Sequence, residues 1–158
     1  MRTQVSEKKL VLPWLLLGLL LVTVACDQRA KAPETESAFV LPEAATITDF
    51  NLAQLERGRY DMEDARGKWS LLFFGYTHCP DVCPTELFML AEMMRGINSN
   101  TEVEIESPQV VFVSVDPQRD NLKHLQEYVA FYHPGFVGVT GEQSTIDRLC
   151  KSMGVFYE

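Results

Sequence analysis

Two runs of mostly apolar residues mark the middle of the chain, at residues 68–74 and 109–115. Neither run alternates between apolar and polar positions, which predicts strands covered on both faces, and residues 68–74 are expected to form a central strand. Between the runs, apolar residues recur at helical spacing, at Leu87, Leu90, Ala91, Met94 and Ile97. Strand, helix and strand in this order predict a right-handed parallel unit and an α/β fold.

Shorter patterns precede the first run. Residues 46–50 alternate like a short strand, and residues 58–60 suggest a second strand that leads into a turn over residues 61–67. The two short strands predict an N-terminal β-hairpin.

Two further helices and a short strand follow the second run. Asp120 is expected to cap a helix with apolar residues at helical spacing, which Pro134 ends. Residues 136–139 are expected to form a short strand, and residues 155–157 to begin another.

The last helix has its own start and stop signals. Ser144 and Asp147 resemble a capping box, and Gly154 stands where a helix C-terminus favours glycine. Cys150 falls on the apolar stripe of this helix and is interpreted as a packing residue.

The N-terminal third has a different composition. Basic residues precede an apolar run in residues 1–26, which predicts a signal peptide or an N-terminal membrane anchor. The residues before Cys26 resemble a bacterial lipoprotein signal, so a lipidated Cys26 and an uncleaved anchor are both open. Residues 27–45, rich in Ala, Pro, Glu and Thr, are expected to be a flexible tether, and residues 46–158 the folded domain.

Length and charge narrow the classes of function. The chain has 158 residues, of which 46% are hydrophobic, which allows one domain with a core. The formal net charge of −8 argues against a nucleic-acid-binding surface.

The chemistry concentrates where the first apolar run meets the first long helix. Cys79 and Cys83 are four residues apart, so their sulfur atoms can share one helix face and either form a disulfide or bind one metal ion. Pro84 suits the first helical position, which places Cys83 at a helix N-terminus, where a lowered thiol pKa is expected. A purely structural disulfide is the simpler alternative.

Other residues near this motif have simpler interpretations. Met89, Met93 and Met94 are expected to pack in the core rather than bind metal through sulfur. For Asp116, a structural role at an Asp-Pro turn and a role at the metal are equally expected. Tyr76, Pro80 and Asp81 are expected to shape the loop that carries Cys79.

Two segments, FGYTHCPDVCPTEL at residues 74–87 and VFVSVDPQRD at residues 111–120, resemble the Sco/SenC family. The resemblance implies a thioredoxin-like three-layer sandwich that binds copper through Cys79 and Cys83, together with a histidine from a later hairpin. It also implies a metallochaperone in the bacterial inner membrane, with its domain in the periplasm. Such a protein would serve the copper A centre of cytochrome c oxidase subunit II and meet other periplasmic copper chaperones.

The same resemblance leaves alternatives open. A thiol-disulfide oxidoreductase would instead use Cys79 and Cys83 to reduce the cysteines of the copper A centre, and a thiol peroxidase is a weaker rival. The chain ends at Glu158, before the family's histidine, so the C-terminal strands and helix are expected to be missing and apolar surface to be exposed. An incomplete product that does neither job is therefore a third hypothesis.

The three histidines of the chain do not stand at the family's ligand position. His78 is the nearest substitute as a third ligand, because it adjoins Cys79. His124 and His133 are interpreted as surface residues. Two thiolates, with or without an imidazole, are soft donors that favour Cu(I) over the four-ligand sites of structural zinc.

Overall fold

The computed structural model describes residues 38–99 and 106–157, and its compact unit spans Ala45–Glu158. Within these residues the elements follow in the order β1 (Asn51–Gln54), β2 (Tyr60–Asp61), α2 (Met62–Ala65), β3 (Ser70–Gly75), α3 (Val82–Ser99), β4 (Gln109–Ser114), α4 (Leu122–Tyr132), β5 (Val137–Thr140) and α5 (Gln143–Ser152). The predicted signal peptide or anchor, and the tether as far as residue 37, lie outside the described residues.

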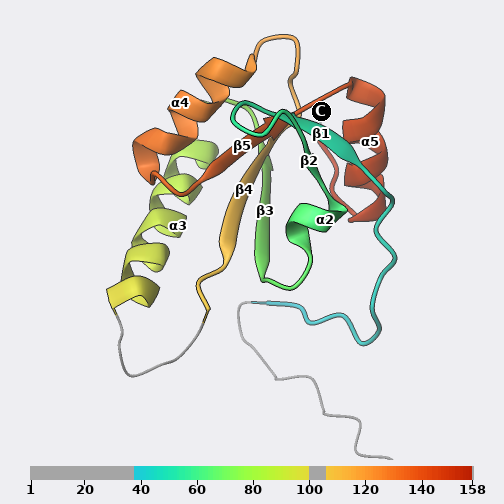
Figure 1. Ribbon diagram of the computed structural model, residues 1–158, viewed down its shortest axis with the longest axis horizontal. Coiled ribbons are helices and arrows are strands. Elements are labelled where there is room, and N and C mark those ends of the chain that lie inside the picture. Colours follow the sequence, from blue (N-terminus) through green and yellow to red (C-terminus); the bar gives the residue numbers. More distant parts are fainter. Residues whose placement is uncertain (1–37, 100–105, 158) are drawn as a thin grey trace, which may run out of the picture. The chain divides into compact units, whose positions relative to one another are not determined.

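The strands form one mixed sheet in the order β2-β1-β5-β4-β3 (Figure 1). β3, β4 and β5 are parallel, and β1 is antiparallel to both β5 and β2. The predicted parallel unit of strand, long helix and strand is confirmed. The carboxyl ends of β3 and β4 lie side by side, with Gly75 paired to Ser114, and this edge of the sheet is where open α/β folds place their sites.

The position of β3 differs from the prediction of a central strand. Among the described residues β3 pairs only with β4, and its side chains from Ser70 to Phe74 are half-buried. An uninterrupted apolar run indicates that both faces of the strand are covered. It does not indicate whether the strand has a neighbour on one edge or on both. An outer strand packed under a helix therefore gives the same pattern as a central one.

The N-terminal hairpin is confirmed, but its first strand begins later than predicted. Residues 46–50 form no strand, and β1 pairs with β2 from Asn51 onward. Gly58 has φ of +76°, a backbone conformation that glycine adopts without strain, and its N–H donates to the Gln54 carbonyl to close the turn. The predicted turn at residues 61–67 contains α2, which Asp61 begins with a capping box to Asp64.

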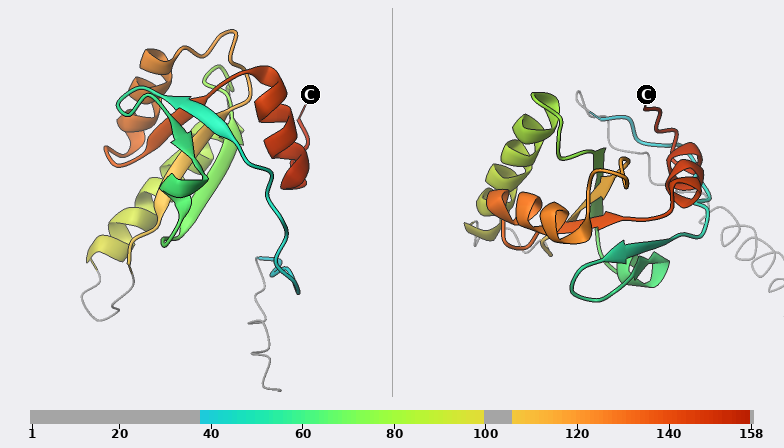
Figure 2. Two further views of the ribbon diagram at one scale, coloured as in Figure 1. Left: turned by 45° about the vertical axis from the view of Figure 1, so that its right-hand side comes forward. Right: turned by 90° about the horizontal axis from the view of Figure 1, so that it is seen from above.

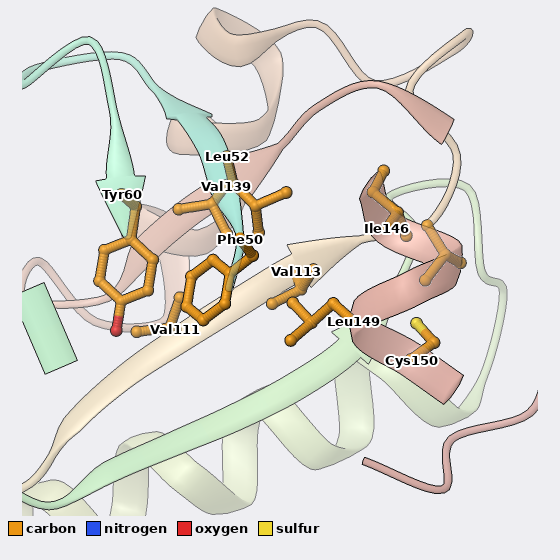
Figure 3. Close-up of a cluster of buried hydrophobic side chains, with 10 residues drawn as sticks. Phe50, Leu52, Tyr60, Val111, Val113, Val139, Ile146, Leu149 and Cys150 are labelled. Atoms are coloured by element: carbon orange, nitrogen blue, oxygen red, sulfur yellow. The ribbon is translucent and has the colours of Figure 1, made fainter. Parts of the chain in front are cut away.

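Two apolar clusters, one on each face of the sheet, give the three layers (Figure 2). One face is covered by α3 and α4, with Leu87, Leu125 and Phe112 fully buried between helix and strand. The other face is covered by α5 and the hairpin, as Figure 3 shows for Leu149, Cys150 and their neighbours. The expected packing of Cys150 is confirmed, since this side chain is 2% exposed.

The helix ends correct several sequence expectations. Asn121, not Asp120, caps α4, because the Asn121 side chain accepts the His124 N–H. α5 begins after Glu142 without a side-chain cap, so the capping box of Ser144 and Asp147 does not form. Gly154 ends α5 with φ of +70°, as predicted.

The chain after α5 forms no strand over residues 155–157, contrary to expectation. Its hydrogen bonds return to α5 instead: the Val155 N–H donates to the Cys150 carbonyl, and the Tyr157 hydroxyl donates to Asp147. Large apolar side chains are exposed on the domain, most of all Phe131 and Phe156. Within the described residues, no helix has both the length and the hydropathy that crossing a bilayer requires.

Candidate functional site

The two motif cysteines lie where β3 passes into α3. β3 ends at Gly75, the cysteine loop (residues 76–81) follows, and α3 begins at Val82. Cys79 is half-buried in the loop, while Cys83 lies in the first turn of α3 and is 6% exposed. The predicted placement of Cys83 at a helix N-terminus is confirmed.

The start of α3 brings the two thiol groups together. The Cys83 N–H donates to the Cys79 sulfur, with 3.4 Å between N and Sγ. Both cysteines are free thiols in this structure. The Cys79 sulfur therefore lies against the start of α3 beside Cys83, so the two thiols belong to one site.

Gly75 makes room for the Cys83 sulfur. A Cβ atom at Gly75 would lie 2.9 Å from Cys83 Sγ and 3.1 Å from two ring carbons of Phe112. Because real Cβ atoms do not approach a neighbour so closely, only glycine allows the sulfur to pack directly on the backbone of β3. The Cys83 thiol is thus held between α3, β3 and the buried Phe112 ring.

The acidities of the two thiols differ, and in the opposite sense to the sequence expectation for Cys83. Hydrogen bonds from the backbone N–H groups of Asp81 and Cys83 lower the pKa of Cys79 from its ordinary value to about 7. Burial raises the pKa of Cys83 to about 11, because desolvation outweighs the backbone hydrogen bonds that lower it. The reactive thiolate at neutral pH is that of Cys79.

Asp120 is a buried part of the site that the sequence reasoning missed. Its carboxylate is fully buried and accepts hydrogen bonds from Thr77 N at 2.9 Å, Thr77 Oγ1 at 2.5 Å and Ser114 Oγ at 2.6 Å. Burial opposes its charged form, but the hydrogen bonds from Ser114 and Thr77 hold the pKa of Asp120 below its ordinary value. An acidic residue just beyond the carboxyl end of a buried strand was the available signal, since neighbouring parallel strands end together.

The histidines do not join the thiol pair in this structure. His78 Nδ1 lies 3.1 Å from Thr77 Oγ1 and 3.6 Å from Asp120 Oδ1, and its ring lies 6.2 Å from that of His124. His133 ends α4 and packs against Phe136. Over the described part of the chain, no cluster of three or more metal-ligating side chains forms, so Cys79 and Cys83 are the candidate metal ligands.

The other residues singled out in the sequence, three methionines and two aspartates, make no side-chain hydrogen bond to the thiol pair among the residues that the structure describes. Only Met94 is buried, while Met89 and Met93 are exposed on α3, so the core-packing prediction is wrong for those two. The Asp116 carboxylate pairs with Arg119, whose guanidinium also lies over the Tyr76 ring. Asp81 is exposed, and its carbonyl accepts the Thr85 N–H at the start of α3.

Comparison with known proteins assigns the chain to a family. The SCO1/SenC family model matches residues 40–158, which is most of the chain. The chain belongs to the SCO1/SenC family. A putative copper-binding protein of Stutzerimonas stutzeri is 31% identical over 141 residues, covering 89% of this chain and 67% of that protein.

Two Arabidopsis thaliana comparisons agree with this assignment. The mitochondrial SCO1 homolog 1 is 39% identical over 115 residues, which is 73% of this SCO1/SenC chain but only 34% of the relative's length. The crystal structure of Arabidopsis ScoI with copper bound superposes with a TM-score of 0.64 at 38% identity, covering 71% of this chain and 68% of that one. The predicted thioredoxin-like fold is confirmed.

Proposed function

We propose that this chain is a copper metallochaperone that binds Cu(I) through Cys79 and Cys83 and serves assembly of the copper A centre of cytochrome c oxidase. The observation that carries the proposal is the arrangement of the two thiols, held together at the carboxyl edge of the sheet in a family with copper-bound members. Copper is the cargo in this proposal, and the protein supplies the ligands.

The donor chemistry of the pair fits Cu(I). Thiolate sulfur is a soft ligand, and Cu(I) accepts a low coordination number, so two sulfur atoms suffice to hold it. The pKa of Cys79, lowered to about 7, makes a thiolate available at neutral pH, whereas the raised pKa of Cys83 requires that its proton leave as the metal binds. Cu(I) binding should therefore release protons.

The proposed location of the protein in the cell rests on the N-terminal segment of the sequence. The basic and apolar N-terminal segment supports attachment to the bacterial inner membrane, with the domain facing the periplasm. There the chain would reach subunit II of the oxidase and exchange copper with other periplasmic copper chaperones.

Competition for Cu(I) against a chromophoric chelator, with the full chain kept reduced, tests the metal site. We expect one Cu(I) per chain, and affinity reduced at least about a hundredfold in Cys79→Ser and Cys83→Ser. Cys150→Ser is the matched control, because Cys150 is a buried thiol of α5 and not one of the two motif cysteines. Unchanged binding in either motif variant, or loss in the control alone, would contradict the proposal.

A second function is favoured by the unequal acidity of the thiols. A thiol-disulfide oxidoreductase needs one accessible, acidic thiol to attack and one neighbour to resolve the mixed disulfide, which are the properties of Cys79 and Cys83. The reduced chain would then reduce an oxidised peptide copied from the copper A motif and become oxidised itself. Reduction of one peptide disulfide for each disulfide formed in the chain, without stoichiometric Cu(I) binding, would make the oxidoreductase the primary function.

A further inference from the structure

The Asp120 carboxylate joins segments that are far apart in the sequence. Ser114 ends β4, Thr77 belongs to the cysteine loop 43 residues before Asp120, and Asp120 itself lies just before α4. Both carboxylate oxygens are used: Oδ2 accepts from Thr77 N and Ser114 Oγ, and Oδ1 accepts from Thr77 Oγ1. The group is fully buried, so no water competes directly for these bonds.

The bonds to Thr77 restrain the residue that leads into Cys79. Two hydrogen bonds from one residue, one from its main chain and one from its side chain, fix both its position and its rotation. The loop then turns tightly, with the Cys79 N–H donating to the Tyr76 carbonyl at 3.2 Å. Little freedom remains between Thr77 and the Cys79 sulfur.

Cys83 is held by different contacts. Its backbone belongs to α3, and its sulfur packs on Gly75 and Phe112. The separation of the two sulfur atoms therefore depends on the helix and strand for Cys83. For Cys79 it depends on the Cys83 N–H, which donates to its sulfur, and on the loop that the buried carboxylate holds.

We propose that Asp120 is a positioning residue for the thiol pair, which acts through Thr77 to hold the Cys79 sulfur at the distance from Cys83 that Cu(I) binding and disulfide formation require. The inference rests on the proposed function but adds a residue that touches neither sulfur. Release of the carboxylate frees the cysteine loop while leaving both thiols in the chain.

Variants of the full chain separate positioning from simple destabilisation. Asp120→Ala removes all three hydrogen bonds and the contact with His78, Asp120→Asn keeps the shape but not the charge, and Thr77→Val removes only the hydroxyl. Gln109→Ala is the matched control: the Gln109 amide donates to Tyr60, Ser70 and Asp64 at the opposite end of β4 from Ser114, so its loss also breaks a polar network.

For each variant, two properties are measured in addition to the melting temperature. The first is Cu(I) affinity by chelator competition. The second is the equilibrium with glutathione, in which the chain's disulfide and two glutathione molecules give the chain's dithiol and one glutathione disulfide. We expect Asp120→Ala to weaken Cu(I) binding about tenfold or more and to shift the second equilibrium several-fold toward the dithiol, because a freed loop lowers the effective concentration of one thiol near the other.

Thr77→Val should change both readouts in the same direction by a smaller factor, and Asp120→Asn should fall between wild type and Asp120→Ala. Gln109→Ala should lower the melting temperature while leaving both readouts within about twofold of wild type. If Asp120→Ala does not fold, Thr77→Val and Asp120→Asn decide the matter. The inference would be overturned if Thr77→Val and Asp120→Asn both kept the wild-type Cu(I) affinity and glutathione equilibrium. It would also be overturned if Gln109→Ala shifted these two readouts as much as the Asp120 and Thr77 variants do.

Failure of the proposed function has a different signature. If the wild-type chain binds no Cu(I), the metallochaperone proposal fails. The positioning role of Asp120 is then tested by the glutathione equilibrium alone. A shift there in Asp120→Asn and Thr77→Val, but not in Gln109→Ala, would support the positioning role in a purely redox protein.

Discussion

Substitution of Gly75 by alanine should damage the thiol pair while changing no ligand. The added Cβ would lie 2.9 Å from Cys83 Sγ and 3.1 Å from Cε2 and Cζ of Phe112. Carbon atoms in contact are normally about 3.5 to 4.0 Å apart, so these atoms must separate by roughly half an ångström or more. Phe112 is fully buried and Cys83 is 6% exposed, which leaves little room for either to yield.

The size of the effect follows from this geometry. Overpacking of a buried site costs about 1–3 kcal/mol, and we expect Gly75→Ala to lower the free energy of unfolding by an amount in this range. Relief of the contact displaces the Cys83 sulfur, and a displaced ligand binds the metal less well. Cu(I) affinity should therefore fall at least about tenfold, as measured by chelator competition.

Two other glycines give controls with the same chemical change. At Gly138 a Cβ would lie 2.8 Å from Leu125 Cγ, so Gly138→Ala should destabilise the fold and leave Cu(I) affinity unchanged. At Gly96, within α3, a Cβ would meet nothing within 4 Å, and alanine should stabilise the helix by about 0.5–1 kcal/mol. A Gly75→Ala protein with wild-type stability and wild-type Cu(I) affinity would refute the argument that this glycine seats the sulfur.

Three further outcomes are expected. Alkylation by iodoacetamide, followed by mass spectrometry, should modify Cys79 with a midpoint near its pKa of about 7 and Cys83 only as the pH approaches its pKa of about 11; equal rates at pH 8 would contradict the assigned asymmetry. Asn121→Ala should cost about 1 kcal/mol in urea unfolding, because the cap on the His124 N–H is lost, with Cu(I) affinity unchanged. Cys150→Ser should cost about 1–3 kcal/mol through a buried hydroxyl without a matched partner, and a neutral result would show that this position can reach water.

The sequence predicted those parts of the fold whose signals are local. The apolar runs at β3 and β4 and the helical spacing of α3 each lie within one segment, so periodicity was enough to place them. The cysteine pair was found in the same way, because its spacing and the start of α3 are both visible in the chain. Residues 74–87 therefore gave the site and its chemistry together.

The errors arose where the outcome depends on distant residues. Asp120 was assigned to the nearest helix end, but its carboxylate accepts from Thr77, 43 residues earlier. Its place beyond the carboxyl end of a buried strand indicated the edge of the sheet but not this partner. The acidity of Cys83 was predicted from the helix N-terminus alone. Burial against Gly75 and Phe112 reverses it, and burial is known only once β3 and β4 are paired.

The asymmetry of the thiols bears on how copper would leave the site under the proposed function. Transfer by ligand exchange requires that one sulfur be replaced first, and Cys79 is both more exposed and, with the lower pKa, the better leaving thiolate. After that step Cu(I) depends on Cys83, whose raised pKa means that a proton competes for the sulfur at neutral pH. Under the proposed function, the burial of Cys83 against Gly75 would thus ease the release of copper to a partner.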